Sequence, residues 1–436
     1  MTSVEGLTQS LGRELFTLVH KETRPIITSF WWKEKAIMWF ARDDNLRTQM
    51  LRFVDVFPAL QTTEEQKQHM REYLIQGLPR TPPIFRIADA LSSFPLGAKI
   101  VASVAEQSIK TISQQFITRS TPPEVLISIE KLQKEGVSYT LDVLGEAVLS
   151  EYEADEYMKK YISFMEQLSS LDCPRIDLSL KLSALYSQFD PVDFQGSVEA
   201  VKNRLRKILR VAKDMAASVT LDAEQSQYRD MTLKIFTEIF DEEEFKNFEN
   251  AGIAMHTYFL DSEEKIRDLI AWAKGRATPI LVRLVKGAYW DWEIITAAQK
   301  RWPTPVYREK WQTDMCFERC TDVLLENCGV IRLGVASHNI RSIAQAMAKA
   351  SILNVPRDRL EFQVLLGMGD LLKKAILRMG NSVKVYMASG ELLPGMGFLV
   401  RRIIENTAQT GFLFQSLGTG VPVKELLKSP QGTRLS

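Results

Sequence analysis

The sequence predicts an α/β fold: a (β/α)8 barrel preceded by an all-helical N-terminal region. From about residue 136 onward, eight short β-branched runs alternate with amphipathic stretches of about 10 to 20 residues. Together they occupy about 290 residues, the usual size of such a barrel. Before them, apolar residues recur at helical spacing without a convincing strand. A doubly wound sheet is the alternative, but it usually has fewer repeats, and no GxGxxG motif follows the first strand.

The N-terminal region has the pattern of amphipathic helices, with Trp31 and Phe40 among charged residues. Two proline clusters, GLPRTPPIF (77–85) and RSTPPEV (119–125), break this pattern, and the second falls where the periodicity changes. The boundary is therefore predicted there. The expected parts are a helical arm or α-domain over 1–125, the barrel over 126–420 and a C-terminal tail over 421–436.

The eight predicted strands are short runs rich in β-branched residues, as buried parallel strands are. They are 137–144, 176–185, 218–224, 253–259, 279–287, 331–337, 360–367 and 382–389. Amphipathic stretches such as 198–216 and 262–276 lie between them and are predicted to form the outer helices.

The composition excludes several classes of protein. Lys and Arg total 55 against 54 Asp and Glu, and this net charge of +1 gives no field that would attract nucleic acid. No apolar run reaches the roughly 18 residues that a membrane-spanning helix needs, and the N-terminus does not resemble a signal peptide. Four cysteines and four histidines, without metal-site spacing, predict no metal centre; carboxylate-only magnesium binding stays open. The cysteine usage fits a reducing compartment.

Polar residues recur where each predicted strand ends. In a (β/α)8 barrel the active site lies at the carboxyl ends of the strands, so these residues indicate a site for a polar ligand. About a third of such residues are expected to be merely solvated or ion-paired. The residues are Asp142, Glu146, Lys181, Asp222, Glu224, His256, Arg283, Lys286, Ser337, His338, Gln363 and Tyr386.

Arg401 and Arg402 interrupt the apolar run of the last predicted helix, FLVRRIIENTAQ, and Glu405 follows one turn later. Two adjacent guanidinium groups in a buried stretch are costly unless they are paired. One interpretation is a salt bridge to Glu405 on the helix surface. The other is bidentate binding of a ligand carboxylate, at a point that Lys181 and Tyr386 could also face.

Arg283 and Lys286 lie on one predicted strand edge, followed by a glycine. Two cations there suit a phosphate or an electron-rich ring that becomes anionic on reduction, and an isolated basic strand end is the alternative. The Trp-rich run 289–292 could stack on an aromatic cofactor or pack as part of an extra helix. His256 and His338 are each either structural or catalytic.

The cysteines at 316, 320 and 328 are predicted to lie in one helical stretch and to pack. Asn339 or Ser337 is predicted to cap the helix that opens at SHN (337–339). GMG occurs at 367–369 and at 395–397, where it indicates either a phosphate site or turn glycines.

Seven segments resemble, in this order, the proline dehydrogenase domain of proline utilization A flavoenzymes. They are DVLGEA, LKLSALYSQFDP, LDAE, LVRLVKGAYWD, SHN, EFQVLLGMGD and YMASGELLPGMGFLVRRIIENTA. The resemblance covers about 136–415. It implies a (β/α)8 barrel that holds FAD and oxidises L-proline to Δ¹-pyrroline-5-carboxylate. Hydride transfer to the flavin would be followed by passage of electrons to a membrane quinone, as the first step of proline catabolism to glutamate.

The resemblance also implies roles for individual residues. The substrate carboxylate is expected to bind Lys181, Arg401 and Arg402, and the substrate ring to contact Asp222 and Tyr386. Glu146 matches the acidic residue that pairs with the first of the two arginines. The flavin-contacting set is His256, Arg283, Lys286, Gly287, Ala288, Tyr289, Ser337, His338, Gln363 and Glu405.

The chain departs from the family at His256, where the family usually has Gln. A histidine in the hydrogen-bond shell of the flavin is expected to titrate near neutrality, so the pH dependence would differ. The chain also ends about 30 residues after the last helix, without an aldehyde dehydrogenase domain. We therefore expect release of the product to a separate pyrroline-5-carboxylate dehydrogenase.

Two other functions stay open. One is another flavin barrel oxidoreductase, such as a methylenetetrahydrofolate reductase-like enzyme. The other is a non-catalytic barrel that binds a carboxylate ligand. The expected location is cytoplasmic, with peripheral contact with the inner membrane, and the chain is expected to form a homo-oligomer.

Overall fold

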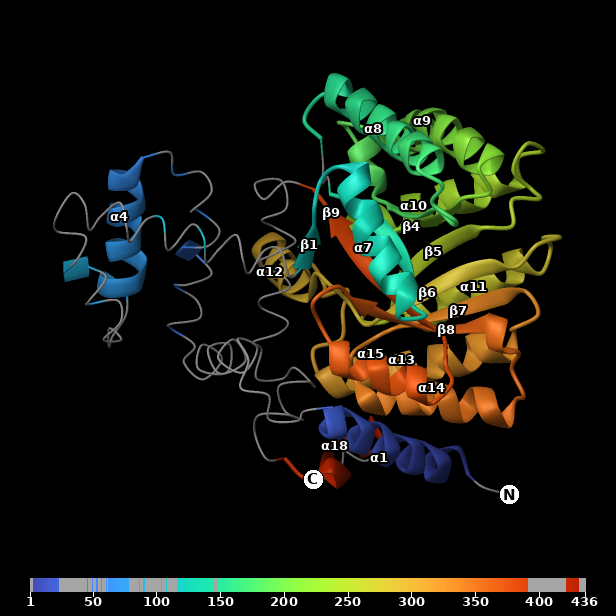
Figure 1. Ribbon diagram of the computed structural model, residues 1–436. Coiled ribbons are helices and arrows are strands. Elements are labelled where there is room, and N and C mark those ends of the chain that lie inside the picture. The colour runs from blue at the N-terminus through green and yellow to red at the C-terminus, as the bar shows by residue number, and fades with distance from the viewer. Residues whose placement is uncertain are drawn as a thin grey trace.

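The computed structural model describes residues 3–22, 62–77, 116–144, 148–390 and 421–430, with isolated positions between 45 and 107. Its centre is a closed barrel of eight parallel strands, with helices on the outside (Figure 1). The barrel order is β9-β2-β3-β4-β5-β6-β7-β8, and the pairing of β8 with β9 closes the ring. The predicted (β/α)8 barrel is confirmed, and the doubly wound alternative is excluded.

All eight predicted strands are present. They are β2 (Ser138–Val143), β3 (Asp177–Leu180), β4 (Ser218–Leu221), β5 (Ala251–His256), β6 (Ile280–Val285), β7 (Ile331–Ala336), β8 (Leu360–Leu365) and β9 (Val383–Ser389). A short additional strand, β1 (Ile117–Thr118), pairs with the end of β9. The second predicted run, 176–185, was too long: β3 ends at Leu180, because Leu182–Leu185 forms the 3₁₀ helix η3.

Helix α9 (Phe194–Asp214) buries one stripe of apolar residues against the barrel. On α9, Val198, Val201, Leu205 and Ile208 are fully buried at helical spacing. The outer helices are α7 (Pro122–Lys134), α8 (Glu151–Ser170), α9 (Phe194–Asp214), α10 (Ser226–Asp241), α11 (Ser262–Ala273), α12 (Trp290–Lys300), α13 (Lys310–Glu326), α14 (Ile340–Ile352) and α15 (Asp370–Arg378), with short 3₁₀ helices η4 (Pro191–Asp193) and η5 (Arg357–Arg359).

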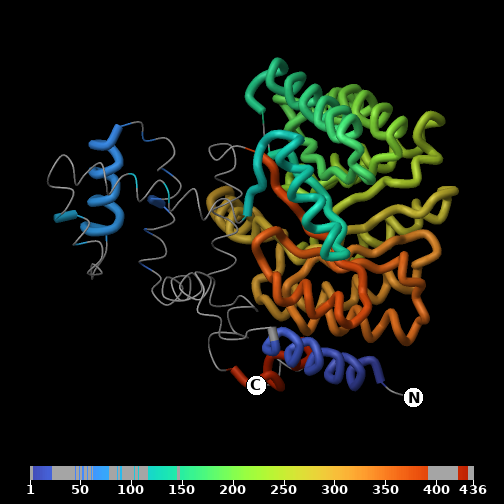
Figure 2. Tube along the Cα trace, viewed as in Figure 1, coloured from blue at the N-terminus to red at the C-terminus, as the bar shows by residue number. Residues whose placement is uncertain are grey.

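The first and last helices that the structure describes meet on the outside of the barrel. Figure 2 shows helix α1 (Val4–Glu22) and the short helix α18 (Val423–Leu426) side by side against α14. The guanidinium of Arg341, on α14, donates to both carboxylate oxygens of Glu5 at 2.7 Å and to the carbonyl of Leu427 at 3.0 Å. Leu427 is fully buried, so part of the predicted tail contributes to the core.

Of the predicted helical arm, the described residues form α1, α4 (Thr63–Arg71) and the π-helical turn η2 (Glu72–Gln76). Thr62 caps α4, and Glu65 completes a capping box with it. The rest of the arm lies outside the described residues, so the domain boundaries stay predictions. None of the helices in the described residues is long and apolar enough to cross a bilayer.

The long connection between β6 and β7 contains the tryptophans and cysteines singled out in the sequence. Trp290 and Trp292 lie in α12, an additional helix before α13, as one of the two interpretations predicted. Cys316 and Cys320 are buried in α13 as expected, but Cys328 is not in that helix. The helix ends at Glu326, because the chain turns over residues 327–330 to enter β7.

Candidate functional site

Five polar side chains from different strands converge inside the carboxyl end of the barrel. They belong to Thr140 on β2, Asp222 after β4, Arg283 on β6, Gln363 on β8 and Tyr386 on β9. Because these strands are mostly not neighbours, side chains that touch one another must meet in the interior. The parallel arrangement places all the strand ends at one side of the barrel, which is why residues so distant in the sequence share one site.

Asp222 is the centre of this cluster. The Arg283 guanidinium donates to its Oδ1 at 2.5 Å, and the Tyr386 hydroxyl donates to its Oδ2 at 2.7 Å. The guanidinium also lies 5.1 Å from the centre of the Tyr386 ring. Burial raises the pKa of Asp222, although Arg283 and Lys181 oppose this. Burial also raises the pKa of Tyr386, which therefore remains a hydrogen-bond donor across the ordinary pH range.

Lys181, directly after β3, donates to Oδ2 of Asp142 at 2.6 Å. Burial disfavours its charged form, but the Asp142 and Asp222 carboxylates outweigh this effect and raise the pKa of Lys181. The site thus holds a fixed ammonium with donors left for an anionic group. Sequence reasoning named Asp142 as a strand-end residue but gave it no role. Its position opposite the lysine depends on the pairing of β2 with β3.

Arg283 is held from a second side by Gln363, whose Oε1 accepts from Nε at 2.7 Å. Nη2 approaches the Thr140 hydroxyl at 3.5 Å. Arg283 is 3% exposed and Gln363 is 3% exposed. The guanidinium therefore presents a fixed charge rather than a flexible one.

Lys286 follows the end of β6 and pairs with Asp314 of α13, which also accepts from Lys310 at 2.6 Å. Desolvation lowers the pKa of Lys286. Burial favours a neutral Asp314, but the two lysines outweigh it and lower its pKa to about 2. Asp314 lies in the connection between β6 and β7 and was not identified from the sequence, because no pattern marks which helical acid faces a strand end.

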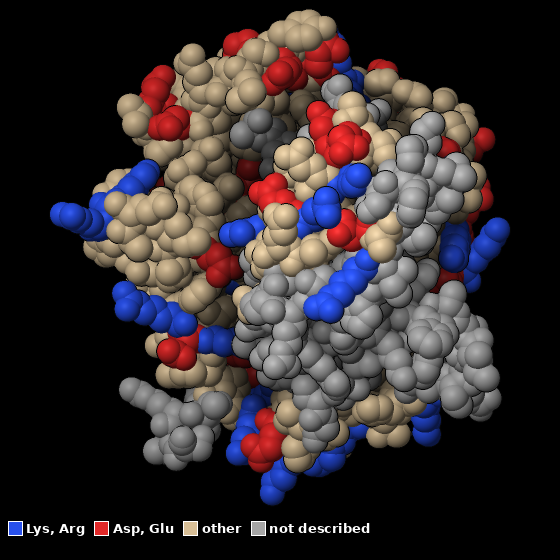
Figure 3. All heavy atoms as spheres, turned by 90° about the vertical axis from the view of Figure 1, so that its left-hand side faces the viewer, with Lys and Arg blue, Asp and Glu red and all other residues tan. Residues whose placement is uncertain are grey.

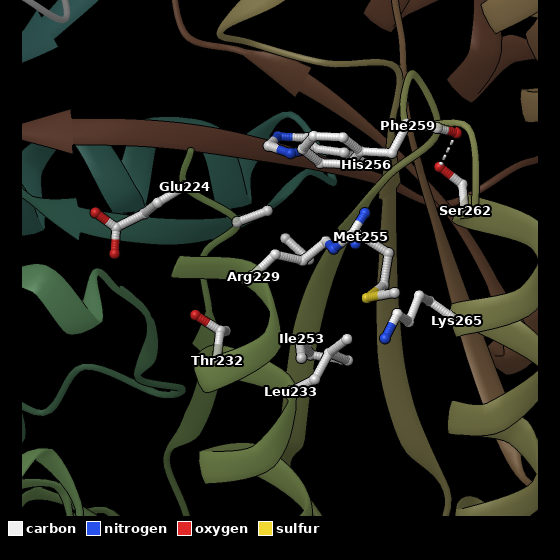
Figure 4. Close-up of a pocket in the computed structure, with 12 residues that line it drawn as sticks. Glu224, Arg229, Thr232, Leu233, Ile253, Met255, His256, Phe259, Ser262 and Lys265 are labelled. Carbon is white, nitrogen blue, oxygen red and sulfur yellow. Dashed lines mark hydrogen bonds between the residues drawn. The ribbon is translucent and has the colours of Figure 1, made fainter. Parts of the chain in front are cut away.

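His256, the last residue of β5, is 6% exposed and makes no hydrogen bond to another described residue. It borders a small pocket between β5 and the helices α10 and α11, which also includes Glu224 and Met255 (Figure 4). Its ring lies edge-on to Tyr258, with 4.9 Å between centroids. Burial and the nearby Arg229 lower the pKa of His256 to about 3. The expectation that it titrates near neutrality is wrong, because burial disfavours the charged form of the ring and lowers its pKa.

His256→Gln is expected to reduce the loss of stability in acid. Since the folded pKa of about 3 lies below the unfolded value, the folded state binds fewer protons between the two values. Stability due to this group is complete above about pH 6.5 and falls as the pH drops toward 3, by about 2 kcal/mol at pH 5. The check is thermal unfolding at pH 7 and pH 5. An equal drop in Tm for both proteins would show that His256 does not resist protonation.

Three predicted cofactor residues lie directly after β6. Gly287 packs against Tyr258, and a Cβ at that position would lie 2.4 Å from the tyrosine ring. The glycine thus lets the backbone approach where a side chain would not fit. Ala288 is half-buried, and Tyr289 directly precedes α12 as its N-cap residue.

Ser337 and His338 follow β7. The Ser337 hydroxyl accepts from the Asn339 N–H at 3.1 Å, and the Asn339 side chain caps α14, which confirms the predicted helix start. Nε2 of His338 accepts from the Leu365 N–H at 3.3 Å. Gly367 and Gly369, the two glycines of the first GMG, have φ of +75° and +73°, as turn glycines do, and Gly369 lies beside the His338 ring where α15 begins.

Glu146, Arg401, Arg402 and Glu405 lie outside the described residues, and the roles predicted for them stay predictions. Figure 3 shows the left-hand side of the molecule as seen in Figure 1, which is the side on which α12 lies. Basic and acidic side chains of the described residues are mixed there. Glu224 is a further buried acid at this end that received no role; it accepts from the Ser183 N–H at 3.1 Å, and burial raises its pKa.

Two family models match the chain. The model described as proline dehydrogenase matches residues 125–415, and the model described as proline utilization A N-terminal domain matches residues 5–116. Among curated relatives, bifunctional protein PutA of Escherichia coli (strain K12) is 28% identical over 346 residues, which are 77% of this chain and 26% of the relative. Proline dehydrogenase 1 of Bacillus subtilis (strain 168) is 28% identical over 310 residues, 70% of this chain and 90% of the relative.

A solved structure covers nearly all of this chain. It is proline utilization A from Bdellovibrio bacteriovorus inactivated by N-propargylglycine, with a TM-score of 0.89 and 36% sequence identity. The match covers 99% of this chain and 44% of that chain. This chain therefore spans less than half of that protein and about a quarter of the Escherichia coli relative.

Proposed function

Since this chain belongs to the proline dehydrogenase family of enzymes, we propose that it binds FAD and oxidises L-proline to Δ¹-pyrroline-5-carboxylate. The observation that carries the proposal is the buried cluster of Lys181, Asp222, Arg283 and Tyr386 inside the carboxyl end of the barrel. A fixed ammonium, a fixed guanidinium and a protonated phenol are suited to an anionic substrate with a small ring.

Lys181 would hold the carboxylate of proline. Its ammonium has three N–H donors, and one of them points to Asp142. A charge-assisted bond to the substrate fixes the orientation of the proline ring, because the ring is rigidly joined to the carboxylate. By family resemblance, Arg401 and Arg402 would complete this carboxylate site, and Glu146 would pair with the first arginine.

The residues present fit a flavin. His256 is a buried polar ring without a hydrogen bond to another described residue, so its ring nitrogens are available to a ligand at this end of the barrel. Arg283, Lys286, Gln363 and the turn at Ser337 and His338 supply further polar groups around the same strand ends. FAD, when bound, supplies the acceptor for the hydride that leaves Cδ of proline.

The chain's own side chains have three tasks in this reaction. Oxidation removes a hydride from Cδ and a proton from the ring nitrogen, so that a C=N bond forms. Lys181 holds the carboxylate, and Tyr386 fixes the Asp222 carboxylate beside the substrate. Arg283 places a permanent positive charge where negative charge develops, which lowers the barrier without reorganisation.

The electrons are proposed to pass to a membrane quinone, with the enzyme at the cytoplasmic surface of the inner membrane. The reaction would be the first step in the conversion of proline to glutamate. A pyrroline-5-carboxylate dehydrogenase would consume the product.

The test begins with the visible spectrum of the purified protein, reconstituted with FAD if necessary. Flavin bands near about 450 nm that bleach with L-proline under anaerobic conditions are expected. Acid precipitation should leave the yellow dye in solution, because no Cys or His lies in a known attachment pattern. With an artificial electron acceptor, o-aminobenzaldehyde should trap the product.

N-propargylglycine, which inactivated the Bdellovibrio relative, is expected to bleach the flavin of this protein irreversibly. A protein that binds FAD but is not reduced by proline would contradict the proposed substrate. A protein that binds no FAD would contradict the proposed cofactor, and yellow colour retained in the acid pellet would contradict noncovalent binding.

A further inference from the structure

A chain of polar contacts, buried except at the partly exposed Glu361, leads from Arg283 toward the amino end of the barrel. Gln363 joins Arg283 to Glu361: its Oε1 accepts from Arg283 at 2.7 Å, and its Nε2 donates to Glu361 at 2.6 Å. Lys384 then bridges Glu361 and Asp177, with its Nζ 3.0 Å from a carboxylate oxygen of each. The barrel interior therefore contains an ordered line of alternating charges beneath the proposed site.

Gly334 makes the first of these contacts possible. In register, Gly334 of β7 lies between Arg283 of β6 and Glu361 of β8. A Cβ on Gly334 would lie 2.6 Å from Nε2 of Gln363. A contact that short does not occur, so any larger residue would displace the amide that crosses β7 to reach the arginine.

Glu361 determines which way the Gln363 amide faces. Its carboxylate can only accept, so it selects the NH₂ group of the amide and leaves Oε1 for the Arg283 Nε–H. A flipped amide would place Oε1 of Gln363 against the Glu361 carboxylate and its NH₂ group against the Nε–H of Arg283. Both clashes would be costly, because Gln363 is only 3% exposed and water cannot compensate them. Lys384, 7% exposed in its side chain, holds the Glu361 carboxylate in place from the other side, with 3.0 Å between Nζ and Oε1.

We propose that Glu361 is a positioning residue for the reaction, acting through Gln363 on Arg283, with Lys384 and Gly334 as its structural support. The inference rests on the proposed function, in which Arg283 stabilises the reduced flavin. With the amide locked, the guanidinium has one orientation, toward Asp222 and the flavin-binding strand ends. Without the lock, Arg283 loses the hydrogen bond at Nε and is held only from the side of Asp222 and Thr140, so the plane of the guanidinium is less firmly fixed.

The direct test is Glu361→Leu, measured with proline and, independently, by the reduction potential of the bound flavin titrated against a reference dye with a chemical reductant. The flavin potential should become more negative and kcat should fall about 10- to 100-fold, with KM for proline changed less than kcat. Glu361→Gln, which preserves size, should shift both quantities in the same direction by less. Gly334→Ala disturbs the same amide from the other side and should also make the potential more negative.

Lys384→Met tests the support of Glu361, and Lys373→Met is its matched control. Both lysines are 7% exposed in their side chains and ion-paired, but Lys373 pairs with Glu135 on the outside of the barrel. Only Lys384→Met should move the flavin potential. A double-mutant cycle gives the decisive comparison. If Glu361 acts through Gln363, adding Glu361→Leu to Gln363→Leu should lower kcat by less than about 2-fold further.

An unchanged potential in Glu361→Leu and Glu361→Gln would overturn the inference, as would additive effects with Gln363→Leu or an equal shift in Lys373→Met. If proline fails to reduce the wild-type flavin while the chemical reductant succeeds, the proposed substrate is wrong. The potentials of the variants would still decide the role of Glu361 in that case.

Discussion

Lys181→Met is expected to lower kcat/KM for L-proline by about 30- to 1000-fold, because one charge-assisted contact to the carboxylate contributes roughly 2–4 kcal/mol. FAD content should remain normal. Steady-state kinetics with proline and with prolinamide measures the effect. The loss should be much smaller for prolinamide, which has no carboxylate. Equal losses for the two substrates would show that Lys181 does not bind this group.

The substitution also leaves Asp142 buried without its partner, which costs about 3–5 kcal/mol of stability. Lys181→Met combined with Asp142→Asn removes the unpaired charge, so it should recover Tm but not proline binding. Lys202→Met is the matched control. Lys202 is also 9% exposed and ion-paired, but its partners are Glu199 and Glu238 on the outer helices.

Arg283→Met is expected to slow the reduction of the bound flavin by proline about 100- to 1000-fold, the usual effect of removing one fixed group that stabilises developing charge. Asp222 would lose its cation at the same time, and burial would then raise its pKa further. Rapid mixing under anaerobic conditions measures the rate of reduction directly. FAD affinity, measured separately, distinguishes weaker binding from slower chemistry.

Arg341→Met is the comparison for this variant. Arg341 is 5% exposed and Arg283 is 3% exposed, and both are ion-paired, but Arg341 joins α1 to the outside of the barrel. It should lower Tm without slowing flavin reduction. If Asp222→Asn restores the rate of Arg283→Met, the arginine serves only to neutralise the aspartate, and its proposed role in stabilising the reduced flavin is wrong.

The barrel itself could be predicted because each parallel strand is buried on both faces, which produces a short β-branched run that recurs eight times. The residue at which each strand ends was harder to predict. In the run after residue 176, leucines alternate with polar residues through Leu182 and a further leucine follows at 185, yet the chain leaves the sheet at Leu180, since residues 182–185 are buried as a 3₁₀ helix instead. Burial gives an apolar sequence in either conformation, so composition does not locate the end.

The candidate site divides in the same way. Residue type and position at a strand end were enough to select Lys181, Asp222, Arg283 and Tyr386, because the topology of a parallel barrel brings strand ends together whatever the details. Which of these side chains touch was decided by register. The partner of Lys181 proved to be Asp142 on the adjacent strand.

Three features depend on contacts between segments far apart in the chain, and no local pattern marks them. Asp314 reaches Lys286 from α13, 28 residues later. The low pKa of His256 follows from the packing that buries its ring, whereas the residue type alone suggests titration near neutrality. Glu361 acquires its position only when Gly334 lets Gln363 cross β7. Periodicity and residue chemistry determine the fold class and the candidate residues, because they reflect burial and charge residue by residue. Hydrogen-bond partners and protonation are properties of pairs, and only the closed barrel brings those pairs within reach.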